Sequence, residues 1–166
     1  MKKLAFVICL ILCTSLSYAQ EMQIDHARRD VVWTKVYITD MTQEEILTEI
    51  LARNLLLNVV TTPGMIAGDI PPYFINYKAA GYGRLNMPLY MTNAKFGGRI
   101  ILRFKEGRYH AEVCNMYFGD MPGDPLFSDR TYLYDYNQDI TFNTTISLIL
   151  RDMPILTSFQ RPDDSW

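Results

Sequence analysis

Hydrophobic and polar residues alternate most regularly in residues 97–118, whose sequence is GGRIILRFKEGRYHAEVCNMYF. A period of two is typical of a β-strand with one buried face, and the Glu-Gly pair in the middle favours a hairpin turn. If the turn holds an even number of residues, Phe104 lies opposite Tyr109 and the apolar residues of both strands share one face. A shift of one residue would bury the charged set, so we predict the even register. The predicted buried face carries Phe96, Gly98, Ile100, Leu102, Phe104, Tyr109, Ala111 and Val113.

The same register gives this hairpin a polar face. Arg103 lies opposite His110 and Arg99 opposite Cys114, and both arginines are diagonal neighbours of Glu112. Exposed ion pairs of this kind contribute about 0–1 kcal/mol each. We therefore interpret them as ordinary outward-facing residues of a charged sheet face.

Candidate chemistry on this face is limited to His110, Glu112 and Cys114. A zinc site needs a third and fourth ligand, and the only other histidine is His26. A Cys–His nucleophile pair at this spacing has Cα atoms about 13 Å apart along a strand, too far for a hydrogen bond. Arg99 would lower the pKa of the Cys114 thiol, which leaves a reactive cysteine open. We predict no catalytic residue, no metal site and no cofactor.

Residues 31–38, VVWTKVYI, are rich in β-branched and aromatic residues and favour a strand. The even positions are predicted to face the core, and the odd positions to form a second, amphipathic face. The predicted core face carries Val32, Thr34, Val36 and Ile38, and the second face carries Trp33, Lys35 and Tyr37.

Two segments have apolar residues at helical spacing. The first runs from Thr42 to about Leu57, and Thr42 and Glu45 fit a capping box. The second follows Asp139 as its N-cap, and Pro154 should bend or end it. The apolar stripes consist of Ile46, Leu47, Ile50, Leu51 and Leu55 in the first helix and of Phe142, Ile146, Ile149, Leu150 and Met153 in the second.

The chain between residues 61 and 95 follows no single period. Gly64–Gly68 favours a short strand, and the prolines and glycines after it interrupt any regular element. One interpretation is a long connection held in place by its own aromatic residues, and the other is a binding loop. The aromatic residues are Tyr73, Phe74, Tyr77, Tyr82 and Tyr90.

Residues 119–139 combine aspartates with proline, glycine and tyrosine. The spacing of the aspartates matches no calcium-binding loop, so we interpret the segment as a solvated acidic loop. Residues 132–134 favour a short edge strand. The aspartates are Asp120, Asp124, Asp129, Asp135 and Asp139.

The N-terminus has the pattern of an export signal. Lys2 and Lys3 precede an apolar run of about 13 residues, 4–16, which is too short to span a bilayer. Small residues then favour cleavage between Ala19 and Gln20. We expect an exported protein, periplasmic or secreted, without a transmembrane segment.

Removal of residues 1–19 would leave 147 of the 166 residues, enough for one domain with a hydrophobic core. We expect a flexible leader at residues 20–30, a single domain at 31–158 and a frayed tail at 159–166. Loss of the two signal lysines would change the net charge from −2 to −4. A mildly acidic chain lacks the basic surface typical of nucleic-acid binding. Cys114 would be the only cysteine left, which excludes an internal disulfide.

The order of these parts resembles a known family. A signal ending in Tyr-Ala-Gln precedes a strand WTKVY, a Thr-capped helix, a short Gly64–Gly68 segment, a hairpin leaving its turn as GRY, and a C-terminal helix. In this, most of residues 31–158 resembles exported bacterial domains of unknown function with a TATA-binding-protein-like (TBP-like) fold, although the Pro/Tyr-rich stretch 69–95 departs from the family. The resemblance implies an α+β fold, with an antiparallel curved sheet and two helices on one face in β-α-β4-α order. It implies no activity, cofactor or catalytic residue.

Two functions remain open. The first is an envelope module that binds a protein or glycan, without catalysis, through the open sheet face and the Tyr/Pro-rich loop. The second is a hydrolase that uses loop carboxylates among Asp120, Asp124 and Asp129, which two aspartates converging in a cleft would support. Alternatively, residues 69–95 or 119–139 cover the open face, and Trp33 belongs to a minor core. The candidate binding residues are Trp33, Tyr37, Arg99, Arg103, His110 and Glu112.

Overall fold

The structure is a computed structural model that describes residues 21–138 and 141–159. The predicted signal peptide with its cleavage site after Ala19, the predicted N-cap Asp139 and residues 160–166 of the predicted frayed tail lie outside the described residues.

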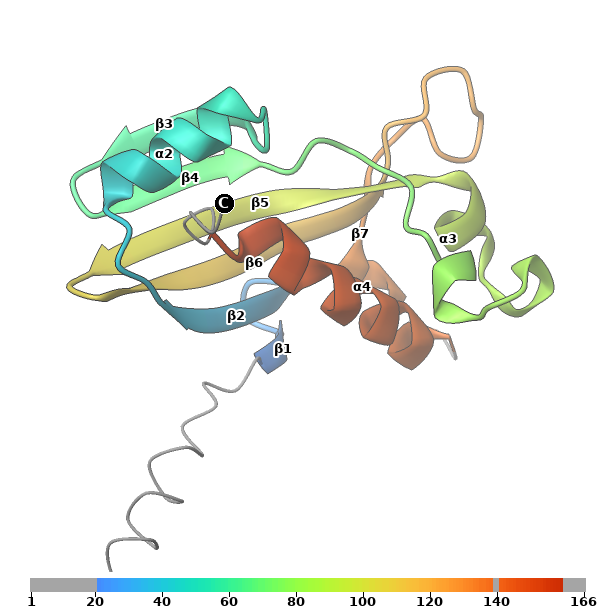
Figure 1. Cartoon of the computed structure of the whole chain (residues 1–166). Coiled ribbons are helices and arrows are strands. Elements are labelled where there is room, and N and C mark those ends of the chain that lie inside the picture. Colours follow the sequence, from blue (N-terminus) through green and yellow to red (C-terminus); the bar gives the residue numbers. More distant parts are fainter. Residues whose placement is uncertain (1–20, 139–140, 160–166) are drawn as a thin grey trace, which may run out of the picture.

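One antiparallel sheet with helices packed against it forms the described part of the chain (Figure 1). Its strands follow the order β1-β2-β6-β5-β4-β3, and β7 pairs with β6. The strands are β1 (Glu21–Asp25), β2 (Asp30–Ile38), β3 (Leu57–Thr62), β4 (Met65–Asp69), β5 (Lys95–Lys105), β6 (Arg108–Gly119) and β7 (Thr131–Tyr132). The helices are α2 (Gln43–Ala52), α3 (Leu89–Asn93) and α4 (Phe142–Thr157), with 3-10 turns η1 (Lys78–Ala80), η2 (Arg84–Asn86) and η3 (Leu133–Tyr136).

The α+β class with an antiparallel sheet is as predicted, but the element order is richer than β-α-β4-α. Strands β1 and β7 and helix α3 are additional to that order. Strand β1 lies within the predicted flexible leader, where it pairs with β2 along its whole length. Asp25 stabilises the intervening turn, because its carboxylate accepts hydrogen bonds from the backbone N–H groups of Ala27 and Arg28 at 3.0 Å. The prediction of a flexible leader is therefore wrong for this segment.

The predicted register of the β5–β6 hairpin is confirmed. Phe104 lies opposite Tyr109, and Arg103 lies opposite His110. The pairing shifts between Gly97 and Arg99, where Asn115 adopts a positive φ of 49°. This β-bulge divides the hairpin into a regular half near the turn and a bulged half near the loops.

The predicted core face of β2 is wrong. Trp33 is completely buried, whereas Ile38 on the predicted core face is 67% exposed. Trp33 also lies opposite Val113, which belongs to the buried face of the hairpin. The error has a physical cause, because β-branched residues favour a strand conformation on either face. The β-branched residues of β2 therefore indicated a strand but did not indicate which face is buried.

Helix α2 begins as predicted and ends earlier. The Thr42 hydroxyl accepts from the Glu45 backbone N–H at 3.2 Å, and the Glu45 carboxylate accepts from the Thr42 N–H at 2.7 Å. The helix ends at Ala52 rather than near Leu57, since Asn54 adopts a positive φ of 50°. Asparagine tolerates this left-handed conformation, which terminates helices. The residues beyond it form β3, which the sequence pattern did not predict.

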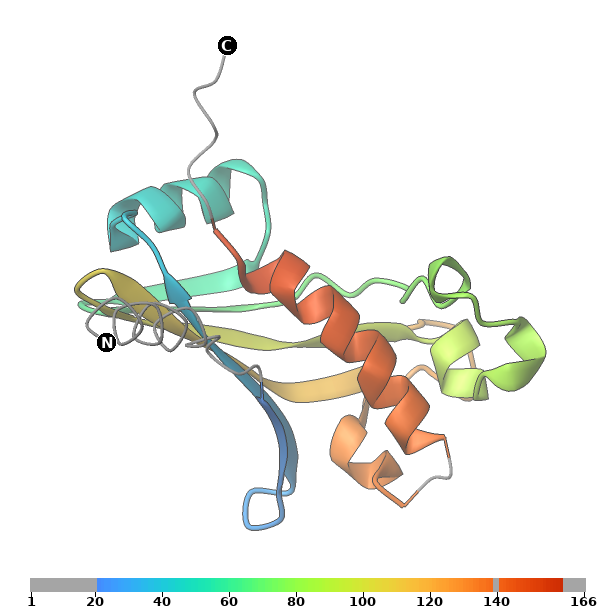
Figure 2. The same cartoon turned by 60° about the horizontal axis from the view of Figure 1, so that its bottom comes forward.

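Helix α4 packs across the sheet and continues past Pro154 to Thr157. The hydroxyls of Tyr37 and Tyr109 each contact Thr157, at 2.8 Å to its Oγ1 and to its carbonyl oxygen respectively. In both views of the cartoon, α2 and α4 lie along the same side of the sheet (Figures 1 and 2). Ile46 of α2 belongs to the same buried cluster as the helix-facing residues of the strands.

The long segment between β4 and β5 contributes to this core. Tyr73 pairs with Phe96 in a β-bridge, and its hydroxyl donates to Asp152 of α4 at 3.2 Å. Tyr90 is buried and stacks on Tyr136 with ring centroids 4.0 Å apart. These aromatic side chains attach the segment to the helix side of the sheet. Its other buried residues are Ile70, Ile75, Met87, Met91 and Ala94.

The opposite side of the sheet, here called the open face, carries no helix of the described residues (Figure 2). Its residues follow from the strand registers, because residues of one parity share one face. The open face carries Val32, Thr34 and Val36 of β2, Met65, Ala67 and Asp69 of β4, Arg99, Ile101 and Arg103 of β5, and His110, Glu112 and Cys114 of β6.

Candidate functional site

Two of the six predicted binding residues lie on the helix side of the sheet. Trp33 is buried, and Tyr37 is half-buried and stacks on Tyr109 with ring centroids 5.1 Å apart. The Trp33 indole N–H is buried without a hydrogen-bond partner among the described residues. The prediction that these two aromatic residues project from the open face is wrong.

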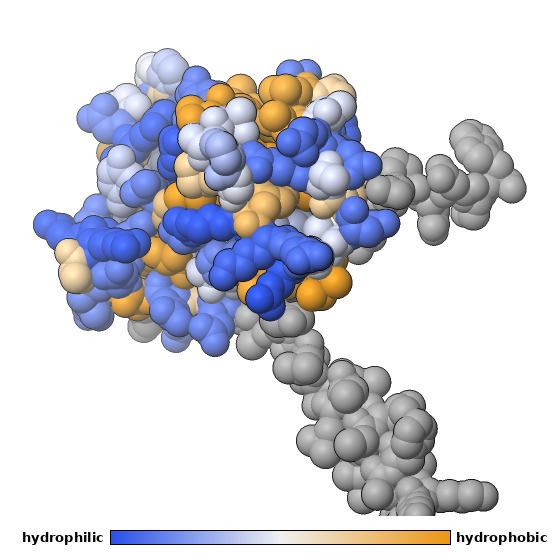
Figure 3. Space-filling view, turned by 90° about the vertical axis from the view of Figure 1, so that its left-hand side faces the viewer, coloured by the Kyte–Doolittle hydropathy of each residue, from blue (hydrophilic) through white to orange (hydrophobic). Residues whose placement is uncertain are grey.

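The other four, Arg99, Arg103, His110 and Glu112, lie on the open face. Arg103 pairs with Glu112 at 2.6 Å, and Arg103 and His110 line a depression of about 340 Å³ near the hairpin turn. This end of the molecule is mostly hydrophilic, with separate hydrophobic patches (Figure 3). Arg99 lies further along the strand, in a different pocket.

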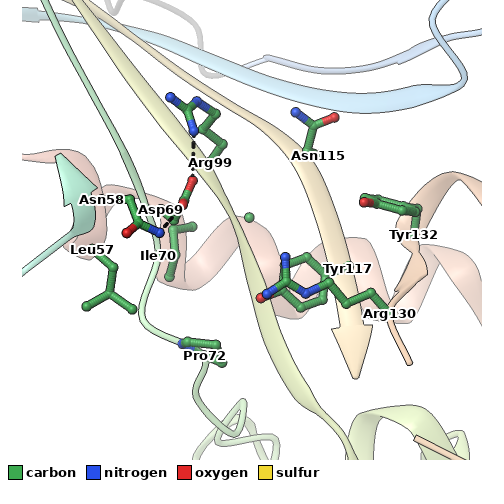
Figure 4. A pocket seen from close by; sticks show the side chains of 11 residues that line it. Leu57, Asn58, Asp69, Ile70, Pro72, Arg99, Asn115, Tyr117, Arg130 and Tyr132 are labelled. Carbon is green, nitrogen blue, oxygen red and sulfur yellow. Dashed lines mark hydrogen bonds and ion pairs between the residues drawn. The ribbon is translucent and has the colours of Figure 1, made fainter. Parts of the chain in front are cut away.

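That pocket, of about 350 Å³, lies where the bulged half of the hairpin meets β4 and β7 (Figure 4). Its volume is within the usual range for small-molecule sites. It is lined by Leu57, Asn58, Asp69, Ile70, Pro72, Gly98, Arg99, Asn115, Tyr117, Arg130 and Tyr132.

One side of the pocket is built by three polar residues from three strands. Arg99 Nη1 donates to Asp69 Oδ1 at 3.0 Å, and Asn58 Nδ2 donates to Asp69 Oδ2 at 2.9 Å. Asp69 lies opposite Arg99 in the β4–β5 ladder, so the sheet register itself creates the ion pair. The carboxylate therefore orients both neighbouring side chains at this side of the pocket.

The other side is built by Tyr117 and Arg130, and Asp120, which does not line the pocket, bonds to both. The Tyr117 hydroxyl donates to Asp120 at 2.6 Å, and Arg130 donates to both oxygens of Asp120 at 3.0 and 3.1 Å. The Arg130 guanidinium also lies 4.4 Å from the centroid of the Tyr117 ring. Hydrogen bonds from Arg130 hold the pKa of Asp120 below its usual value, while burial and then Asp120 raise the pKa of Tyr117.

The bulge positions the Tyr117 side of the pocket. Asp30 at the start of β2 accepts hydrogen bonds from the Asn115 backbone N–H at 3.0 and 3.1 Å, which stabilises the positive φ of that residue. Beyond the bulge, Tyr117 lies opposite Gly97. A Cβ atom on Gly97 would lie 2.5 Å from the Tyr117 ring, so the ring can occupy this place only above a glycine.

Cys114 is not an activated thiol. Burial, followed by the nearby carboxylates of Asp30 and Glu112, raises its pKa to about 11, and Arg99 only partly opposes this. Arg99 lowers the pKa as expected, but desolvation outweighs this partly exposed arginine, so the net shift is upward and the structure does not support a reactive cysteine. Within residues 21–138 and 141–159, no three His, Cys, Asp or Glu side chains are grouped to hold a metal ion.

The aspartates of the hydrolase hypothesis have local contacts. Asp120 is paired with Arg130, and Asp124 accepts hydrogen bonds from the backbone N–H groups of Leu126 and Phe127 at 2.8 and 3.2 Å. Neither these two nor Asp129 lines the pocket described above. A general acid in glycoside hydrolysis needs a raised pKa, which Asp120 does not have.

Most of the residues that line the pocket were not predicted from the sequence. Arg99 was identified, whereas Asn58, Asn115, Tyr117, Arg130 and Tyr132 were not. One signal was present in the sequence, because the alternation of β6 ends at CNMYF, where three apolar residues follow an asparagine. Such a break in period is typical of a bulge.

No helix among the described residues has both the length and the apolar composition needed to cross a bilayer.

Comparison with solved structures finds a similar fold in a TBP-like protein from Parabacteroides distasonis ATCC 8503. The two chains have a TM-score of 0.51 and 12% sequence identity, and the similarity covers 80% of this chain and 91% of the other. A comparison with known sequence families finds no match, and a comparison with curated proteins finds none either. At 12% identity the similarity concerns the fold and not the function. The chain therefore has a TBP-like α+β fold.

Proposed function

We propose that this protein is an exported, non-catalytic binding module of the cell envelope that takes a glycan or protein ligand on the open face of its sheet. The observation that carries the proposal is the pocket between Arg99 and Arg130, which lies on the face that no described helix covers. Of the four predicted binding residues on this face, only Arg99 lines the pocket and is kept as a candidate, whereas Arg103, His110 and Glu112 lie elsewhere on the face. Trp33 and Tyr37 are withdrawn, since they belong to the helix side.

The composition of the pocket supports binding. Arginine and tyrosine are enriched among residues that contribute most to binding, because they offer large contact areas and several hydrogen bonds. Arg99 and Arg130 are each held by a carboxylate, so they need little reorganisation when a ligand arrives. Tyr132 remains 45% exposed and offers an accessible aromatic ring at the rim.

Cys114, the thiol on this face, is not activated, which favours binding over catalysis. The Cys114 thiol has a raised pKa, and the register places it on the same strand as His110 but four residues away. A nucleophile and its base must lie within hydrogen-bond distance, which is about 3 Å. The described part of the open face thus supplies polar contacts rather than a reactive pair.

Export is proposed from the sequence of residues 1–19, which combines a basic start, a short apolar run and a small-residue cleavage site. Intact mass of the native protein tests it directly. A mature chain beginning at Gln20 supports the proposal, and native protein that retains residues 1–19 contradicts it.

The binding proposal is tested with a matched pair of arginine variants. Arg99 and Arg103 both lie on the open face of β5 and both pair with one carboxylate, but only Arg99 lines the pocket. Purified wild type, Arg99→Gln and Arg103→Gln are immobilised and exposed to fractionated envelope polysaccharides and envelope proteins. We expect capture to fall at least about tenfold in Arg99→Gln and to stay near wild type in Arg103→Gln, with equal melting temperatures.

Equal capture by all three proteins would contradict the assignment of the pocket. Release of shortened saccharides from a captured fraction would contradict the non-catalytic role and favour the hydrolase alternative.

A further inference from the structure

We propose that the pocket on the open face binds an acidic saccharide, a sugar unit that carries a carboxylate. This inference rests on the proposed binding function and names the ligand class for the same site. It follows from the charge of the pocket, the hydrogen-bonding capacity of its side chains and its place on the face of the sheet.

The charges that line the pocket favour an anion. Arg99 and Arg130 contribute two positive charges and Asp69 contributes one negative charge, within a chain whose net charge is −2. Asp120 does not line the pocket but pairs with Arg130 and offsets part of its charge, so the attraction for an anion depends on the guanidinium N–H groups that face the ligand. Opposite charge at a pocket attracts a charged ligand and orients it.

Both arginines keep hydrogen-bonding capacity. A guanidinium has five N–H groups in a planar arrangement that matches a carboxylate. Among contacts with described residues, Arg99 uses Nη1 towards Asp69, and Arg130 uses Nε and Nη2 towards Asp120. The remaining N–H groups of each guanidinium can donate to a second carboxylate.

The rest of the pocket suits a sugar ring. The amides of Asn58 and Asn115 can donate and accept at the same time, as sugar hydroxyls require. Tyr132 offers an exposed ring, and Leu57 and Pro72 add apolar surface. A pyranose has hydroxyls at its edge and C–H groups on its faces, so one unit contacts both kinds of surface.

The location favours a saccharide over a peptide strand. The pocket lies on the face of β4, β5 and β6, whose backbone groups are already paired in the sheet. A peptide strand binds to a sheet by backbone hydrogen bonds at an edge, and the edges of this sheet are β1, β3 and the two-residue β7, which pairs with the end of β6. On the sheet face only side chains can contact a ligand, and carboxylates and hydroxyls suit that mode.

The test uses oligosaccharides of galacturonate, glucuronate and N-acetylmuramate, each beside the same compound with its carboxylates converted to amides. Binding is measured by calorimetry, and the site is mapped by amide NMR. We expect at least one acidic compound to bind about tenfold or more tightly than its amide, with shifts at Asn115 and Arg130. Arg130→Gln and Arg99→Gln should each weaken binding of that acidic compound about tenfold, and Arg103→Gln should weaken it less than twofold.

The outcomes separate this inference from the proposed function. Equal binding of acid and amide with shifts in the pocket overturns the ligand class and leaves the binding function in place. Binding of no compound in the panel overturns the inference, and the capture experiment with Arg99→Gln then decides the binding function separately. If Arg103→Gln weakens binding of the acidic compound as much as Arg99→Gln and Arg130→Gln do, the assignment to this pocket is overturned.

Discussion

The regular and bulged halves of the β5–β6 hairpin come from the same two strands and present different surfaces. In the regular half, each residue has one partner, and Arg103 and Glu112 form an exposed ion pair on the open face. In the bulged half, the register shifts at Asn115, Tyr117 lies over Gly97, and the chain after β6 returns to place Arg130 on the Tyr117 ring. The first half gives a charged sheet face, and the second gives a pocket.

The difference shows how one inserted residue changes a surface. A bulge leaves two residues opposite one and increases the local twist, so side chains beyond it no longer follow the regular alternation. Asn115 is such a residue, and its backbone N–H is held by Asp30. With completely regular pairing, Met116 and Phe118 would have followed Cys114 on the open face, in the place that Tyr117 now takes. We infer that the bulge is the local cause of the pocket.

The largest expected effect comes from adding a side chain at Gly119, where two backbone segments approach closely at the bulged end of the hairpin. Gly119 has φ of 152°, and a Cβ atom there would lie 2.9 Å from the Arg130 Cα and would overlap the Asp129 carbonyl oxygen. Because these are backbone atoms, Gly119→Ala should lower the free energy of unfolding by about 3 kcal/mol and displace Arg130. Urea unfolding measures the first effect and ligand titration the second.

The matched substitution lies at the turn of the regular half. Gly107 has a positive φ of 68°, and an added Cβ atom would meet no atom within 4 Å, so Gly107→Ala should cost only about 1–2 kcal/mol of backbone strain. Equal losses of unfolding free energy in Gly119→Ala and Gly107→Ala would show that the close approach of residues 129 and 130 to Gly119 does not affect stability.

A smaller difference in stability is expected between Tyr→Phe substitutions at two positions of β6, one in each half of the hairpin. The Tyr109 hydroxyl donates to the Thr157 carbonyl at 2.8 Å and accepts from the Phe159 N–H at 3.0 Å, both buried. Tyr109→Phe leaves both backbone groups unsatisfied and should destabilise the fold by about 2 kcal/mol. Tyr117→Phe removes one hydrogen bond to Asp120, which keeps its two bonds from Arg130, and should cost below about 1 kcal/mol.

Thermal and urea unfolding of the two variants test this difference. The reverse order would mean that the Tyr117–Asp120–Arg130 contacts, rather than the attachment of the C-terminal segment, stabilise β6.

The regular half could be predicted from the sequence, because strict alternation fixes both the face and the partner of each residue. Only one register kept Phe104 and Tyr109 on the apolar side, and the structure has that register. The capping box of α2 was predictable for the same reason, since Thr42 and Glu45 are neighbours within one turn. Local geometry determines such features without knowledge of the rest of the chain.

The pocket and the faces of β2 could not be predicted in this way. Trp33 is buried because the helix side of β2 is covered, and the sequence of β2 alone contains no information on which face that is. Arg130 meets Tyr117 only after the chain has passed through a loop of about ten residues, whose path no local rule specifies. Contacts between distant segments decided both cases, as is usual for sites in loops.

The smallest expected effect compares the ion pairs of the two halves by double-mutant cycles. Arg130 and Asp120 share two hydrogen bonds, and Arg130 is also held by the Tyr117 ring, so Arg130→Gln with Asp120→Asn should give a coupling of about 1 kcal/mol. Arg103 and Glu112 share one contact, so Arg103→Gln with Glu112→Gln should give below about 0.5 kcal/mol. Couplings from urea unfolding at 50 mM and 500 mM salt measure both, and the second should fall closer to zero at high salt. A larger coupling for the Arg103 pair would show that the regular half, rather than the pocket, holds the stronger electrostatic interaction of this face.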